Sequence, residues 1–93
     1  MVHSLTYYSN VTRKNVIGIR VKTVRKNARM SQMKLAAEMQ LQGIKIDRSA
    51  VAKLESGRRP ISDIEIIAIA TILSVSIPSL FEGSEKLSKH LEM

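Results

Sequence analysis

Apolar residues recur at helical spacing in the first part of this 93-residue chain. From Ile17 they fall at i, i+4, i+7 and i+11, which is one stripe of an α-helix, and Asn15 is a suitable N-cap. Ser31 is a second suitable cap, and Gly43 offers the left-handed residue that commonly ends helices. The pattern predicts one helix over about residues 16–27 and a second helix that follows Ser31.

A third segment, over about residues 48–56, is predicted to be a short amphipathic helix with Asp47 as its N-cap. Successive residues of a helix lie about 100° apart, so the residues of this segment separate onto two sides. Glu55 falls at the boundary between the sides. The apolar side holds Ala50, Val51 and Leu54, and the opposite side holds Arg48, Ser49, Ala52, Lys53 and Ser56.

Two more helices are predicted toward the C-terminus. Ser62 and Glu65 have the spacing of a capping box, which favours a helix up to about Leu73. Ser76 is placed to cap a short helix that ends at Phe81. Alternation typical of strands is not sustained anywhere, so the chain is predicted to be all-α, with about five short helices in one compact bundle.

Composition narrows the choice of partner. Fifteen Lys and Arg against eight Asp and Glu give a net charge of +7 and a pI near 10.2. That balance suits a polyanion such as nucleic acid, or an anionic membrane surface. The absence of cysteine excludes disulfides and thiolate metal sites and fits a reducing cytoplasm. The N-terminus lacks the pattern of a signal peptide, so a soluble cytoplasmic protein is expected.

Three short motifs resemble one known family, the phage repressor and Cro type of helix-turn-helix regulators, often called the Xre family. They are Ser31-Gln32 followed by Leu35-Ala36, the sequence LESG at 54–57, and the sequence IATILSVS at 69–76. The resemblance covers about residues 15–82. It implies a lambda-repressor-like bundle that binds double-stranded DNA and regulates transcription, with repression favoured over activation. Residues 1–14 would be an N-terminal arm and residues 83–93 a C-terminal tail.

The helix over 48–56 is the expected reader of DNA bases, because its outward side is small and polar and the major groove admits an α-helix. Arg48, Ser49 and Lys53 are the predicted base-reading residues, and a G-containing half-site is expected. The alternative is an ordinary solvated helix face. The predicted phosphate contacts are Gln32, as the resemblance implies, together with Lys45, Arg58 and Arg59.

The resemblance implies a structural task for Glu55. In the family, the glutamate at this position pairs with an arginine of the first helix, and the matching residue here is Arg25. A surface role, in which Glu55 balances Arg58 and Arg59, is the alternative.

The chain departs from the family between Met39 and Asp47, where the turn is about five residues longer than usual. Either the second helix continues for another turn to Gln42, or the insertion forms a loop that carries Lys45 toward the DNA backbone. The first is preferred because Gly43 comes where a stop is needed. Ile44 and Ile46 would then cover the edge of the core. Arg29, where relatives often carry glycine, is expected at positive φ.

The helix over about 63–73 is apolar nearly all round, which is typical of helices buried on more than one side. One side of this helix would pack in the core of the bundle. Its other apolar side would be covered by another subunit, by the N-terminal arm or by the C-terminal tail. A homodimer on a palindromic site is favoured, because helix-turn-helix dimers read two half-sites related by two-fold symmetry. The candidate dimer face is Ile64, Ile67, Ala68 and Ile72.

Other functions find less support in the residues. No catalytic constellation is present, and neither a metal nor a cofactor is expected, since His3 and His90 lie near opposite ends without metal-spaced partners. Tyr7 and Tyr8 are expected to be packing residues. The main alternative function is an antitoxin-like or accessory module whose principal partner is another protein. A membrane-surface role is the weakest, because the basic residues surround an apolar stripe that the core requires.

Overall fold

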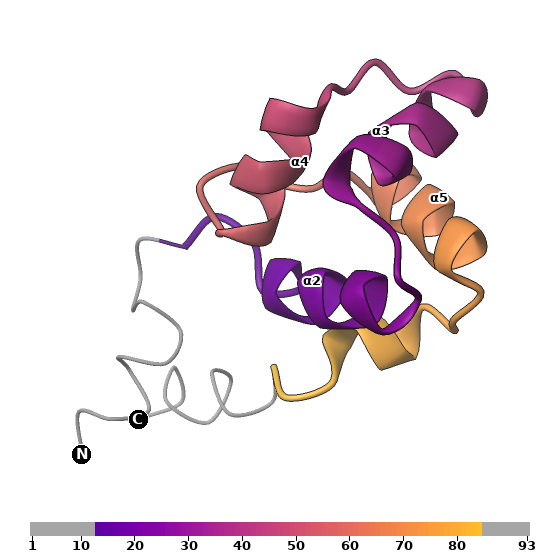
Figure 1. Ribbon diagram of the computed structural model, residues 1–93. Helices are drawn as coiled ribbons and strands as arrows, with labels where there is room; N and C mark the ends of the chain where they lie inside the picture. The colour runs from indigo at the N-terminus through magenta and orange to yellow at the C-terminus, as the bar shows by residue number, and fades with distance from the viewer. Residues whose placement is uncertain (1–12, 85–93) are drawn as a thin grey trace.

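The computed structural model describes residues 13–84. Within this range the chain forms four α-helices and one 3-10 helix, and no strand (Figure 1). The expectations for Tyr7 and Tyr8 of the arm, for the histidines at both ends and for the tail fall outside the described residues. The helices are α2 (Gly18–Asn27), α3 (Gln32–Leu41), α4 (Arg48–Glu55), α5 (Asp63–Leu73) and η2 (Pro78–Phe81).

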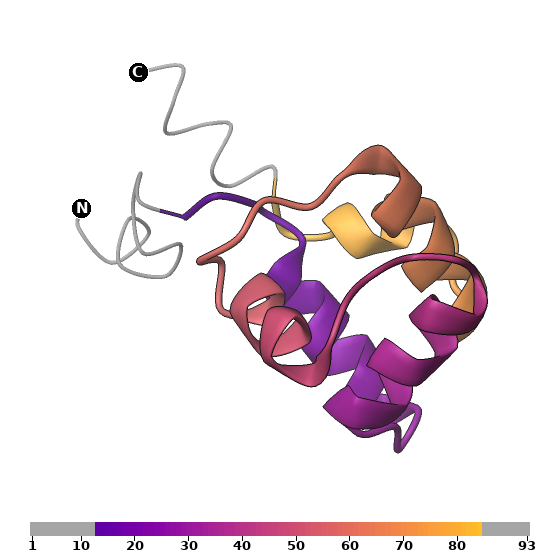
Figure 2. The ribbon, with the colours of Figure 1, turned by 90° about the horizontal axis from the view of Figure 1, so that it is seen from above.

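The predicted apolar stripes converge on one core. Helix α3 packs against both α4 and α5, while α2 packs against α4, α5 and η2, so the helices surround a common centre (Figures 1 and 2). The all-α prediction is therefore confirmed. The largest side chains that are fully buried are Ile17, Val21, Leu35, Met39, Val51, Leu54, Ile69 and Leu80.

Polar caps begin the helices as the sequence predicted. The side chains of Ser31, Asp47 and Ser62 each accept a backbone N–H at the start of α3, α4 and α5. Ser62 and Glu65 form the complete capping box. Helix α2 begins slightly later than predicted, at Gly18, but its N–H still donates to Asn15 Oδ1 at 2.7 Å.

The last helix differs from the prediction, because residues Pro78–Phe81 form a 3-10 turn rather than an α-helix. The N–H of Leu80 donates to the Ile77 carbonyl at 3.0 Å, which is the i to i+3 pattern of a 3-10 helix. The 3-10 form is common in pieces as short as four residues, and Pro78 is tolerated in the first turn.

All four α-helices end in the same way, with a residue at positive φ just after the last turn. These residues are Arg29, Gly43, Gly57 and Ser74, with φ between 57° and 87°. At Gly43 the N–H donates to Gln40 O at 2.9 Å, and the next N–H, that of Ile44, donates to Met39 O at 3.1 Å. This pair of bonds is the Schellman motif, which satisfies carbonyls that the helix leaves unpaired. Positive φ at Arg29 is as expected.

The long turn between α3 and α4 takes the first of the two predicted courses. Helix α3 continues to Leu41, with Gln42 as its cap residue, and Gly43 turns the chain back. Ile46 is then buried in the core, and the partly buried Ile44 packs against the core cluster. Gln40 Nε2 also donates to Ile46 O at 2.7 Å. The insertion thus forms a defined connection.

Within residues 13–84 no helix is both long enough and apolar enough to cross a membrane.

Candidate nucleic-acid interface

Helix α4 presents a small polar surface to solvent. Its inner residues Val51 and Leu54 are fully buried, so the helix is held along its length by the core. Its outer residues Arg48, Ser49 and Lys53 are all exposed, as the periodicity predicted. Asp47 Oδ1 accepts the Ala50 N–H at 2.8 Å and thereby defines where the helix begins.

A buried ion pair connects α4 to α2. Arg25 Nε donates to Glu55 Oε2 at 2.6 Å, and Arg25 Nη2 donates to Glu55 Oε1 at 3.0 Å. The two side chains are 7% and 2% exposed. The third guanidinium nitrogen donates to Met30 O at 2.7 Å. Glu55 therefore turns inward to Arg25, and the alternative in which it balances Arg58 and Arg59 at the surface does not describe its contacts.

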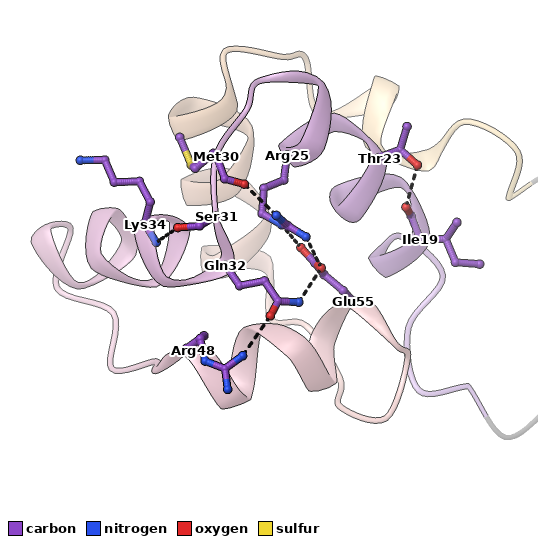
Figure 3. A network of polar contacts seen from close by, with 9 residues as sticks. All are labelled: Ile19, Thr23, Arg25, Met30, Ser31, Gln32, Lys34, Arg48 and Glu55. Carbon is purple, nitrogen blue, oxygen red and sulfur yellow. Dashed lines mark hydrogen bonds and ion pairs between the residues drawn. The ribbon is translucent and has the colours of Figure 1, made fainter.

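Gln32 links this buried pair to the outer face of α4. Its Nε2 donates to Glu55 Oε1 at 3.1 Å, and its Oε1 accepts from Arg48 Nη1 at 3.4 Å (Figure 3). The second bond is at the long end of the range and is correspondingly weak. The Gln32 side chain, which the resemblance assigned to a phosphate, is thus turned toward α4, where it contacts both the core pair and a predicted base-reading arginine.

Helices α3 and α4 stand in the arrangement that a helix-turn-helix requires, with α3 lying across α4 and Arg48, Ser49 and Lys53 on the outer face of α4 exposed to solvent (Figures 1 and 3). Residues 21–80 match the helix-turn-helix family model. The chain belongs to this Xre-like helix-turn-helix family. It is, by family, a DNA-binding regulator of transcription. Searches among curated proteins and among solved structures found no match.

Three cationic residues of the helix-turn-helix were predicted to contact phosphate, and the structure shows that they differ in exposure and in bonding. Lys45 lies exposed on the turn between α3 and α4. Arg58 is also exposed, just after α4, where its Nε donates to Ser56 Oγ at 3.0 Å. Arg59 behaves differently, because its charge is already compensated within the protein.

Arg59 forms a second ion pair, with Glu65 of α5. Its two Nη atoms donate to the Glu65 carboxylate at 3.0 and 2.8 Å, and Nη1 also donates to Pro60 O. This bonding lowers the pKa of Glu65, against an opposing effect of burial, with a further contribution from the Ser62 N–H. It also raises the pKa of Arg59. Arg59 thus joins the loop to the start of α5 through Glu65, and a phosphate contact from this residue stays a prediction.

A sequence signal for this pair existed. A capping-box glutamate points back across the start of its helix, toward the residues that precede it. Glu65 is such a residue, and Arg59 stands three positions before Ser62. The charge of Arg59 alone suggested phosphate binding. The Glu65 carboxylate, however, points back toward Arg59 and accepts its hydrogen bonds.

The candidate dimer face is only half exposed. Ile64 and Ile67 of α5 are 65% and 55% exposed, as a face awaiting a partner would be. Ala68, however, is buried within the described chain, and Ile72 is partly buried against the core. These two residues are corrected to packing positions, because α5 uses nearly its whole circumference except the side that bears Ile64 and Ile67.

Among residues 13–84 there is no group of three His, Cys, Asp or Glu side chains placed to share a metal ion.

Proposed function

We propose that the protein binds double-stranded DNA in a sequence-specific manner by placing α4 in the major groove. The observation that carries this proposal is the two-sided character of α4: Val51 and Leu54 hold one side in the core, and Arg48, Ser49 and Lys53 stand exposed on the other. The groove is about 12 Å wide and accommodates a helix of this kind. Half-buried Ala52 lies between the polar residues and allows close approach.

Base recognition would fall to the exposed residues of α4. Arginine and lysine donate readily to guanine, so a half-site containing G is expected. Arg48 donates a weak bond to Gln32, which slightly reduces the conformational freedom that Arg48 would lose on binding.

Phosphate contacts would come from the residues that surround α4. Lys45 and Arg58 are exposed at the two ends of the helix, on the turn before it and the turn after it. The start of α3, at Gln32, adds a helix N-terminus, which favours anions. Arg59 is left out of this set because Glu65 already binds it.

The functional unit would be a homodimer on a palindromic site. Ile64 and Ile67 form an exposed apolar pair one turn apart on α5, and burying them against a second copy would remove both from water. Two-fold symmetry places two recognition helices in half-sites about 34–36 Å apart. Sedimentation at micromolar concentration tests this: a dimer that Ile64→Lys dissociates supports it, and a monomeric wild-type protein refutes it.

Repression is the preferred mode of regulation, because occupying a site on DNA is enough to exclude other proteins, whereas activation needs a further productive contact. Such a repressor would act in the cytoplasm, where its DNA lies.

Selection of bound duplexes from a random library tests the whole proposal. The wild-type protein is expected to enrich a palindrome with G in each half-site. Parallel selections with Arg48→Ala, Ser49→Ala and Lys53→Ala are expected to change the enriched sequence at separate positions. Enrichment of no sequence, or of the same sequence by every variant, would refute base reading by α4.

A second function is favoured by one observation, the exposed pair Ile64 and Ile67. These residues would equally suit an antitoxin-like or accessory module whose principal partner is another protein. The salt dependence of DNA affinity distinguishes the two functions. Each neutralised phosphate contributes about 0.9 to the slope of log affinity against log salt, so a DNA-binding protein gives a steep slope. A flat slope together with a tight protein partner would favour the second function.

A further inference from the structure

The segment that precedes α2 lies against the C-terminal end of α4, although the two are some 40 residues apart in the chain (Figures 1 and 2). The Lys14 N–H donates to Gly57 O at 2.8 Å. Asn15 Nδ2 donates to Leu54 O at 2.9 Å and to Arg59 O at 2.7 Å. The backbone of residues 14 and 15 is therefore held in place against the turn that follows the recognition helix.

Arg13 strengthens the same junction. Its Nη1 donates to Ser56 O at 3.3 Å, and its Nε donates to Asn15 O at 3.1 Å. The guanidinium covers Gly57 so closely that a Cβ at that position would lie 2.5 Å from Cζ of Arg13. Gly57 has φ of +81°, which favours glycine, whereas the Arg13 guanidinium is the end of a flexible side chain and could move away from a Cβ. A cation at this place also complements the negative end of the α4 dipole.

The junction gathers three cationic residues around one turn: Arg13, Lys14 and Arg58. Lys14 and Arg58 are both exposed, and their backbones are adjacent because Lys14 bonds to Gly57, the residue before Arg58. Near this turn along the chain, Asp63 is exposed, whereas Glu55 and Glu65 are bound by Arg25 and Arg59. The charges of the two glutamates are thus already balanced by other arginines.

We propose that Lys14 and Arg58 together grip the sugar–phosphate backbone beside the groove that α4 enters, with Arg13 and Asn15 as positioning residues that hold Lys14 there. The inference rests on the proposed function and adds to it a contact from residues before 21, outside the range matched by the family. Because the main chain of Lys14 is already anchored, binding a phosphate there needs little further ordering of the backbone.

Salt dependence of DNA affinity tests the grip, measured with the full chain on its selected duplex and on an unrelated duplex. Lys14→Gln is expected to lower the slope of log affinity against log salt by about 0.9, and the double variant Lys14→Gln with Arg58→Gln by about 1.8. Affinity should fall by a similar factor on both duplexes, because phosphate contacts carry no direct sequence information. The melting temperature of Lys14→Gln should match the wild type, since the side chain is exposed.

Arg20→Gln is the matched control. It removes the same unit of charge from α2, where Arg20 contacts Glu82 and Ser79 O near η2. Its slope should equal that of the wild type. If Lys14→Gln leaves the slope unchanged, or if both variants lower it equally, the grip is refuted even though Arg48→Ala still changes the selected sequence. If the wild-type protein binds no duplex, the proposed function itself fails and the grip fails with it.

Discussion

Two arginine–glutamate pairs within residues 13–84 have the same bidentate chemistry in different surroundings. Arg25 and Glu55 join α2 to α4 and are 7% and 2% exposed. Arg59 and Glu65 join a loop to the start of α5 and are 27% and 10% exposed. The first pair connects residues 30 positions apart, and the second connects residues six apart. The buried, long-range pair thus fixes the orientation of α4 against α2, whereas the more exposed, short-range pair stabilises the start of α5.

The energetic difference follows from solvent. Water near the second pair screens its charges and can hydrate one partner if the other is removed. The first pair is almost fully buried, so removing one partner leaves a charge with no compensation. A buried pair need not stabilise the fold more than apolar residues would, yet breaking it is costly.

The largest expected effect is that of Glu55→Ala. It should lower the free energy of unfolding by about 3–5 kcal/mol, because the buried Arg25 loses its partner. Arg48→Ala, on the exposed face of α4, should change stability by no more than about 0.5 kcal/mol. Urea unfolding of the two variants measures the difference. Equal urea midpoints for Glu55→Ala and Arg48→Ala would mean that the buried Arg25–Glu55 pair is not needed for stability.

Replacing both partners distinguishes a stranded charge from a lost attraction. Arg25→Met combined with Glu55→Leu should recover most of the stability that Glu55→Ala loses, because no charge is left buried. If the double variant is as unstable as Glu55→Ala, the stability lost in Glu55→Ala comes from the missing attraction between the two residues and not from the unpaired charge of Arg25.

A smaller effect is expected at the second pair. Glu65→Gln should lower the free energy of unfolding by about 1 kcal/mol, because glutamine preserves the capping bond while the charge-assisted bonds to Arg59 weaken. The loss should shrink in high salt, since Arg59 is partly exposed. A loss as large as that of Glu55→Ala would contradict the comparison.

The second pair should also be visible in acid. The pKa of Glu65 is lowered in the folded protein by its bonds to Arg59, so the folded state holds this proton less tightly than the unfolded state does. The stabilisation is present in full above the ordinary value of 4.5 and is lost as pH falls through the lowered folded value. The difference in unfolding free energy between wild type and Glu65→Gln should therefore narrow below about pH 4.5. A constant difference down to pH 2 would exclude the effect.

The smallest expected change is at the turn that presents Met30 O to Arg25. Arg29 there has φ of 58°, which costs an ordinary residue about 1 kcal/mol. Arg29→Gly should raise the melting temperature slightly, while the Arg25–Glu55 pair stays in place. Ser74→Gly, at the corresponding turn after α5, is the control with φ of 57° and should behave alike. A lower melting temperature in Arg29→Gly alone would show that the Arg29 side chain itself contributes to the turn.

Local rules predicted much of this fold correctly. The caps at Ser31, Asp47 and Ser62 depend on residues within one turn, so the sequence displays them directly. The apolar stripes are equally local, and their residues are buried or partly buried as the periodicity predicted, except Ala28, which is exposed because α2 ends at Asn27. The positive φ of Arg29 was expected from the family resemblance, since relatives often carry glycine at this position.

The site was less predictable wherever a side chain had to choose between two partners. Arg58 and Arg59 are adjacent and chemically identical, yet one is exposed and the other bonds to Glu65. Lys14 and Arg13 carried no signal in the pattern, because their place beside Gly57 depends on how the ends of two helices meet. Periodicity likewise placed Ala68 on an open face that its neighbours in fact cover.

The sequence by itself therefore determined the helices, their caps and the outward set Arg48, Ser49 and Lys53, since these depend on spacing along one element. Only the tertiary structure decided which charges are already paired and which remain exposed to solvent. The reason is physical: a charged side chain can reach several partners, and its choice is made by the packing that brings distant segments together. Glutamates bind Arg25 in the interior and the partly exposed Arg59 at the start of α5, whereas Lys14 and Arg58 stay exposed with their backbones adjacent after α4.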